Sequence, residues 1–140
     1  MFGNGGMAAF ICLNPSTADE TNDDPTVRRC IRYAKAWGMS GMFMLNIFAY
    51  RATDPKEMMT QDDPVGPYND MYIKNRTSIS TIVIAAWGTH GVYKNRETEI
   101  MKMLPDLKCL KVTKDGHPAH PLYLKKDLEP ISFNGGRKDD

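Results

Sequence analysis

The sequence predicts an α/β fold, namely a three-layer α/β/α sandwich around a mostly parallel four-stranded sheet. Apolar runs at residues 7–13, 42–48, 81–86 and 108–112 alternate with segments of helical pattern. The middle two runs are near-continuous in apolar residues, as expected for parallel strands that are covered on both faces. A polar loop follows each run, and in open α/β sheets ligands bind where strands end and such loops begin.

The first predicted helix has clear signals at both ends. Asp24 is a good N-cap, Pro25 suits the first helical position, and Gly38 suits the position after the last turn. One face carries apolar residues at helical spacing: Val27, Cys30, Ile31, Ala34 and Trp37. The cations on the other faces predict a solvated surface, with a nucleic-acid track as the alternative: Arg28, Arg29, Arg32 and Lys35.

Two further helices are predicted, over about residues 67–80 and 94–104, with a short helical turn at Pro55. The inward positions expected for the first are Met71, Tyr72, Asn75 and Ile79, and for the second Ile100 with Met103 or Leu104. A single domain is expected over residues 1–130. Residues 131–140 are expected to form a flexible C-terminal tail.

Composition limits the function classes. A chain of 140 residues suits one domain with a real core, and 41% hydrophobic with 25% charged residues excludes a disordered protein. The net charge of +1 gives no support to a protein that grips duplex DNA through many phosphates.

The cysteines and the N-terminus bear on the cellular compartment. Cys12, Cys30 and Cys109 are far apart, so we expect buried free thiols, which suit a reducing cytoplasm. The N-terminal apolar segment lacks a basic flank and is too short to span a bilayer. We therefore expect a soluble cytoplasmic protein without membrane contact.

The polar loops carry the candidate site. If the strands are parallel, their loops meet at one edge of the sheet. The candidate ligand-binding residues there are Asn14, Ser16, Thr17, Asn46, Tyr50, Arg51, Trp87, Lys114 and His117. An Asn can donate to and accept from a base edge, an aromatic ring can stack on it, and an Arg can hold a phosphate. The set predicts a pocket for a planar, hydrogen-bonding ligand with a phosphate nearby.

Each candidate also has a structural interpretation. Asn14 before Pro15 is a turn former, and Asn46 within an apolar strand can brace a neighbouring loop. Arg51 can pair with a nearby Asp at the surface, and Trp87 can be plain core. The sequence leaves these alternatives open.

The loop GHPAHP places His117 and His120 at a spacing that some metal sites use. A site needs a third ligand, and His90 is the remaining histidine of the chain. We expect no metal ion and no cofactor. A Pro-braced loop that presents one imidazole to the pocket is the preferred interpretation.

Several motifs carry a family resemblance over about residues 8–125. They are LNPSTAD, DDPT, RRC, N-x-F-A-x-RATDP, DPVGPYND, AAWG-x-HG and TKDGHPAHPLYL. On them the chain is identified as a member of a bacterial and phage family called domain of unknown function 1643. The order strand–NPS, strand–N…R…P, strand–WG, strand–HP also resembles the uracil-DNA-glycosylase superfamily more distantly.

That distant resemblance implies roles for particular residues. Asn14 would match a water-positioning residue, His117 or His120 would match a second loop near the phosphates, and Asn46 or Trp87 would help to hold the base. Ser16 departs from the pattern because glycine is usual at its position. The His loop also departs from it, since it lacks the expected serine after proline.

Two functions follow as hypotheses. The first is a protein that binds a nucleobase-containing ligand, a nucleotide or a nucleotide-derived signal, and sequesters it. The second is an N-glycosidase that hydrolyses a base–sugar bond in DNA or in a nucleotide. In that mechanism Asn14 or Asp19 positions water, and His117 or His120 stabilises developing charge. The expected partner is a small nucleotide ligand, with DNA as the alternative, and the sequence leaves homo-oligomerisation open.

Overall fold

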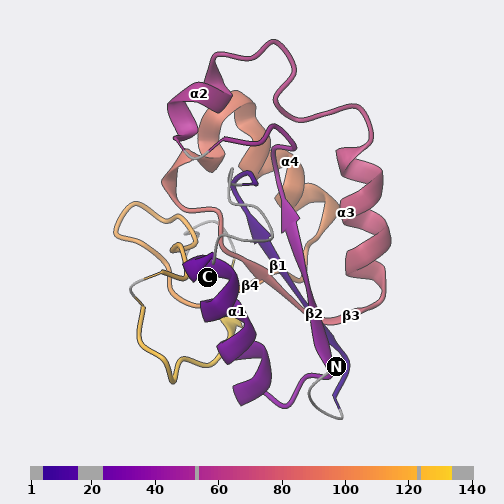
Figure 1. Ribbon diagram of the computed structural model, residues 1–140, viewed down its shortest axis with the longest axis vertical. Coiled ribbons are helices and arrows are strands. Elements are labelled where there is room, and N and C mark those ends of the chain that lie inside the picture. Colours follow the sequence, from indigo (N-terminus) through magenta and orange to yellow (C-terminus); the bar gives the residue numbers. More distant parts are fainter. Residues whose placement is uncertain (1–4, 16–23, 53, 123, 134–140) are drawn as a thin grey trace, which may run out of the picture.

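The computed structural model describes residues 5–15, 24–52, 54–122 and 124–133 and has an α/β architecture (Figure 1). Its five-stranded sheet has the order β2-β1-β3-β4-β5. The strands are β1 (Met7–Cys12), β2 (Gly41–Asn46), β3 (Ser80–Ala85), β4 (Lys108–Cys109) and β5 (Ile131–Ser132). The pairs among β1 to β4 are parallel and β5 is antiparallel, so the sheet is mixed.

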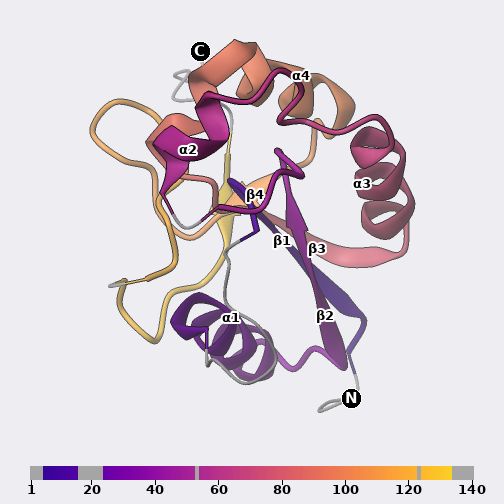
Figure 2. The same ribbon diagram turned by 45° about the horizontal axis from the view of Figure 1, so that its top comes forward.

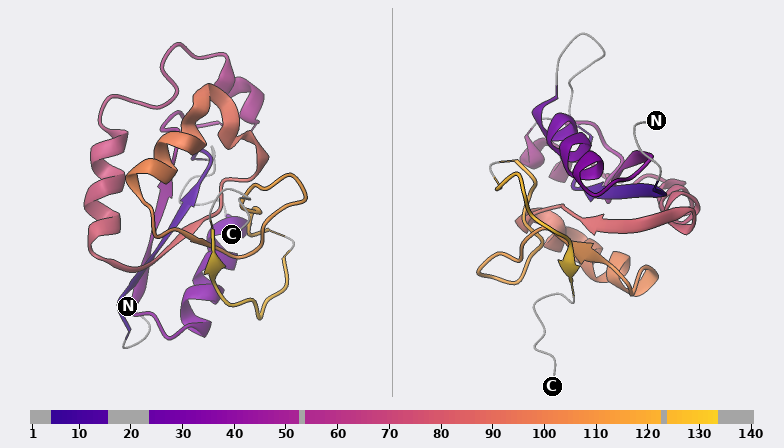
Figure 3. Two further views of the ribbon diagram at one scale, coloured as in Figure 1. Left: turned by 180° about the vertical axis from the view of Figure 1, so that it is seen from behind. Right: turned by 90° about the horizontal axis from the view of Figure 1, so that it is seen from below.

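Helices cover the sheet on its two faces (Figures 2 and 3). The helix α1 (Pro25–Ala36) contributes Cys30, Tyr33 and Ala34 to a core with Phe10 and Ile84. The opposite core takes residues from α2 (Pro55–Met59), α3 (Asn69–Ser78) and α4 (Arg96–Met103). Within the described ranges, no helix has the length and apolar character needed to cross a membrane.

The first helix is built as its sequence predicts. The Asp24 carboxylate accepts hydrogen bonds from the backbone N–H groups of Thr26 and Val27, at 2.9 and 3.3 Å. These bonds satisfy N–H groups that have no partner inside the helix. After the C-cap Trp37, Gly38 adopts a φ of 76°, a left-handed conformation that favours glycine.

The inward face predicted for α3 is wrong. Met71 and Ile79 are 63% and 61% exposed, and the buried side chains are those of Ile73 and Thr77. Because apolar residues occur on more than one side of α3, periodicity did not identify the packed side. Arg76 covers part of the outer side and lies over the Tyr72 ring at 4.7 Å.

Two predicted boundaries also change. The run expected as a strand over 108–112 pairs only at Lys108–Cys109, and the chain then folds back on itself so that Val112 bridges Pro118 in antiparallel fashion. The helix expected from residue 94 begins at Arg96. Lys94 and Asn95 have φ angles of 54° and 56°, outside the α-helical region, and a 3-10 segment at Thr89–Asn95 precedes α4.

The segment from residue 131, expected as a flexible tail, begins instead with a strand of the sheet. Cys109 pairs with Ile131 in β5. Phe133 follows and is only 4% exposed, with its ring edge-on to Trp87 at a centroid distance of 5.9 Å. Residues 134–140 lie outside the described part of the chain. The sheet therefore has one strand more than predicted.

We expect Phe133→Leu to lower the free energy of unfolding by about 1–2 kcal/mol, because it removes a buried ring without emptying the site. Urea denaturation measures the change. Ile131→Thr is the control, since Ile131 is 48% exposed and the change keeps a β-branched residue. Equal effects of the two substitutions would contradict the placement of Phe133 in the core.

Candidate functional site

A hollow of about 610 Å³ lies at the edge of the sheet where the parallel strands end. Its lining comes from five parts of the chain: the end of β1 and its loop, the start of α1, the end of β2 with the loop to α2, the loop after β3, and the segment at residues 120–122. Among the predicted site residues that the structure describes, five line it: Asn14, Asn46, Arg51, Trp87 and His120. A hollow of this size lies within the usual range of small-molecule sites.

Asn14 both braces the pocket wall and faces the pocket. Its Nδ2 donates to the carbonyl oxygens of Ala52 at 2.7 Å, Pro15 at 3.2 Å and Tyr50 at 3.4 Å. These bonds tie the loop after β1 to the loop after β2. No donor among the described residues reaches the Asn14 Oδ1. Of the two polar atoms of this side chain, Oδ1 is the one that can accept a hydrogen bond from a ligand.

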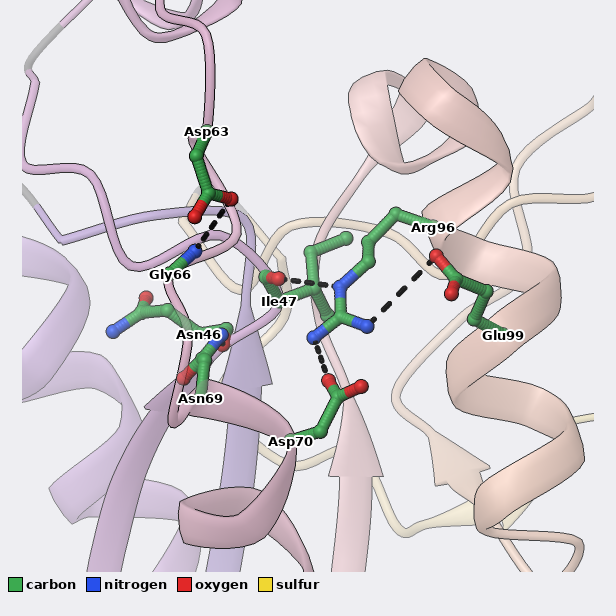
Figure 4. A network of polar contacts seen from close by, with 8 residues as sticks. All are labelled: Asn46, Ile47, Asp63, Gly66, Asn69, Asp70, Arg96 and Glu99. Atoms are coloured by element: carbon green, nitrogen blue, oxygen red, sulfur yellow. Dashed lines mark hydrogen bonds and ion pairs between the residues drawn. The ribbon is translucent and has the colours of Figure 1, made fainter.

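Asn46 is the last residue of β2 and pairs in register with Cys12 of β1. Its backbone oxygen accepts a hydrogen bond from the Asn69 Nδ2 at 2.8 Å. Its side-chain amide points away from Asn69 and from the buried Arg96 (Figure 4). Within the described part of the chain, this amide has no hydrogen-bond partner, and it lines the pocket. It therefore offers a donor and an acceptor to a ligand.

Arg51 and Asp24 bring charge to the pocket lining. Arg51 is an exposed residue in the loop after β2. Asp24 lines the pocket, and its carboxylate also accepts the capping hydrogen bonds of α1. A cation and an anion in one lining favour a ligand that carries both an anionic group and hydrogen-bond donors.

Trp87 lines the pocket but is a core residue, only 2% exposed. Gly91 lies directly against its indole, since a Cβ at that position would come within 2.3 Å of the ring. The indole Nε1 donates to the Glu97 Oε1 at 2.9 Å. Because so little of Trp87 is exposed, a ligand cannot stack on its ring in this conformation, contrary to the predicted role.

His117 pairs with the same carboxylate oxygen. Its Nδ1 lies 3.2 Å from the Glu97 Oε1, and both side chains are largely buried. The backbone of this loop is fixed too, because the Thr113 N–H donates to the His117 carbonyl at 2.7 Å. His117 does not line the pocket. It holds the fold-back loop, residues 112–118, against Glu97 of α4.

The imidazole at the pocket is that of His120, whose Nδ1 accepts from the Leu122 backbone N–H at 3.2 Å. Partial burial lowers the pKa of His120, and the nearby Asp24 carboxylate opposes this shift. The lowered pKa and the hydrogen bond from Leu122 both favour the neutral ring, because a proton on Nδ1 would oppose the Leu122 N–H. The neutral ring then carries its proton on Nε2, as a donor.

The lowered pKa of His120 gives a pH dependence of stability. The unfolded chain takes up the proton near the ordinary pKa of 6.5, before the folded chain does. The contribution of the neutral His120 to the free energy of unfolding is therefore fully present above that value, and it is lost as the pH falls through the lowered pKa of the folded state. When the pH is lowered from about 7 to about 5, we expect the melting temperature of His120→Gln to fall by less than that of the wild type. Identical pH profiles would contradict this account.

The remaining predicted residues do not line the pocket or are not described. Tyr50 is half-buried against the core, and its carbonyl oxygen accepts a hydrogen bond from the Asn14 Nδ2. Lys114 is exposed in the fold-back loop. Ser16, Thr17 and Asp19 lie outside the described residues.

A family model described as Protein of unknown function (DUF1643) matches residues 3–122. The chain belongs to this family. The matched region contains each described residue that lines the pocket, from Cys12 to Leu122. No curated protein and no solved structure matches the chain. The resemblance to the uracil-DNA-glycosylase superfamily stays a prediction.

The cysteines of this DUF1643 chain are free and buried, as predicted. Cys12 lines the pocket, but burial, reinforced by the Asp24 carboxylate, raises its pKa to about 12. It is a thiol at neutral pH and therefore a poor nucleophile. Across the described ranges, no group of three or more His, Cys, Asp or Glu side chains is arranged to hold a metal ion.

Sequence reasoning missed two residues that organise this region, Glu97 and Arg96. Glu97 joins Trp87 to His117. Arg96 is only 1% exposed, donates from Nε to the Ile47 carbonyl at 2.6 Å, and pairs with Asp70 (Figure 4). The available signal was that Arg96 lies four residues before Ile100, on the helix face predicted to be buried.

Proposed function

We propose that the pocket binds a nucleobase-containing ligand, a nucleotide or a nucleotide-derived signal, and that the protein acts by sequestering it. The observation that carries this proposal is the Asn46 side-chain amide, which lines the pocket and has no hydrogen-bond partner among the described residues. A base edge presents paired donors and acceptors that one amide can read bidentately. The Asn14 Oδ1 and the His120 Nε2 add an acceptor and a donor.

The walls suit a flat heterocycle. Apolar side chains from separate elements share the lining: Leu13, Val27, Met44 and Leu122. In place of the stack predicted for Trp87, these side chains would cover the faces of the ring. Burial of that apolar surface drives binding, and the amides orient the ligand.

Arg51 is our candidate for the phosphate of the ligand. It lies in the lining, is exposed, and carries a planar guanidinium that can hold phosphate through two hydrogen bonds. A phosphate held by Arg51 would stay near solvent while the base is enclosed.

Isothermal titration calorimetry against a panel of nucleosides, nucleoside monophosphates and nucleoside triphosphates tests the proposal. We expect at least one base to bind, and the monophosphate to bind more tightly than its nucleoside. A bound ligand at ~100 times its dissociation constant should also raise stability by ~2.7 kcal/mol. If no member binds at millimolar concentration, the proposal is wrong.

The alternative is an N-glycosidase, and one observation favours it. The acceptor oxygen of Asn14 and the imidazole of His120 belong to one pocket. In this scheme the Asn14 Oδ1 orients a water toward the sugar carbon, and the bond between that carbon and the base breaks as the bond to the water oxygen forms. The base leaves with the bonding electron pair and accepts a hydrogen bond from the neutral His120 Nε2–H, while the proton of the attacking water passes to solvent. Chromatography of nucleotides and of DNA after incubation with the protein tests it. Binding without any release of free base would leave the sequestering function alone.

A further inference from the structure

A second hollow, of about 430 Å³, lies along the outer side of α1. Its lining includes four cations, Arg28, Arg29, Arg32 and Lys35, together with Leu122. The predicted solvated helix face is therefore the wall of a groove. In a chain with a net charge of +1, these four cations are a local concentration of positive charge.

The cations form one stripe. At 100° per residue they fall within about 120° of the helix circumference, and they extend over about 10 Å of its axis. No Asp or Glu occurs between Pro25 and Ala36, so every charged residue of the helix itself is a cation. Arg28 and Arg29 also stand near the positive end of the helix dipole, where cations reduce helix stability. An anion in the groove would offset that effect.

The groove adjoins the pocket. Leu122 lines both hollows, and Pro25 of the groove is the chain neighbour of Asp24 and Thr26 of the pocket. A ligand whose base lies in the pocket can therefore continue past the start of α1 onto the cationic stripe. Its continuation must carry negative charge along several ångströms rather than at one point.

We propose that this groove binds a row of two or more phosphates attached to the ligand in the pocket. This inference deepens the proposed function and rests on it for the base. A nucleoside polyphosphate and a short single-stranded oligonucleotide both supply such a row. The shared chemistry is a chain of phosphates held by guanidinium groups.

The test is calorimetry with four probes: a nucleoside monophosphate, the matching triphosphate, a trinucleotide and inorganic tripolyphosphate. The groove variant is Arg29→Gln with Arg32→Gln. The matched control is Lys74→Gln with Lys102→Gln, which changes the net charge equally from two exposed positions on α3 and α4. We expect the groove variant to weaken the triphosphate or the trinucleotide about tenfold or more and the monophosphate less than about twofold. The control should change neither.

The outcomes separate the two proposals. The triphosphate and the trinucleotide are compared by their affinity for the wild type and by the loss of that affinity in the groove variant. The probe that binds more tightly and loses affinity in the variant identifies the source of the phosphates. If the monophosphate binds and extra phosphates add nothing, the groove inference is wrong and the proposed function stands. If no nucleotide binds but tripolyphosphate binds in an arginine-dependent way, the groove stands and the proposed function fails. Equal losses in the groove variant and the control overturn the groove.

Discussion

Asn46→Ala is expected to weaken the tightest nucleotide of the panel by about 10–100-fold while leaving the protein folded. The side-chain amide makes no hydrogen bond to the described residues, so the folded state loses no known internal contact. The bound ligand loses a donor and an acceptor inside a pocket, and each unsatisfied polar group costs about 1–3 kcal/mol. Calorimetry gives the affinity, and thermal unfolding gives the stability.

The matched control is Asn75→Ala, the same chemical change at an exposed position of α3 outside the pocket. It should bind the nucleotide as the wild type does. If Asn46→Ala also keeps wild-type affinity, the base is not read at the end of β2, and the proposed orientation of the ligand must be abandoned.

Arg96→Met is expected to lower the free energy of unfolding by about 3 kcal/mol, because it removes hydrogen bonds that buried groups need. Arg96 is 1% exposed, and its Nε donates to the carbonyl of Ile47, a fully buried residue. Met fills most of the same volume but leaves that carbonyl without its donor. The ion pair with Asp70 adds less, because the Asp70 side chain is 49% exposed. Urea denaturation measures the change.

Arg76→Met serves as the control for the loss of a cation. Arg76 lies over the rings of Tyr72 and Phe43 near the surface, so its replacement should cost less than about 1 kcal/mol. Comparable losses for Arg96 and Arg76 would mean that the Ile47 contact does not support the fold.

The sequence was most informative where a local rule determines the structure. The Asp24 cap, Pro25 and the terminal Gly38 defined α1 because capping depends on adjacent residues only. The polar residues after the strands reached one pocket because parallel strands end at one edge. Asn14, Asn46 and Arg51 were identified on that basis.

The sequence was less informative where the outcome depends on partners far along the chain. Phe133 lies in no apolar run of the sequence, and its burial depends on Trp87, 46 positions earlier (133 − 87). His117 and His120 are alike in sequence, but Glu97 holds the first while the second reaches the pocket. For Arg96, the spacing from Ile100 indicated a buried position, but the partners that make this burial possible, Ile47 and Asp70, come together only in three dimensions.

The pocket takes its lining from segments that begin at Cys12 and end at Leu122, so most of the chain must be in place before the pocket exists. The affinity for the ligand therefore depends on the cooperative folding of all these segments. A saturating ligand should slow amide hydrogen exchange throughout the sheet rather than at the contacting loops alone. Partly folded forms of the chain should not compete for the ligand.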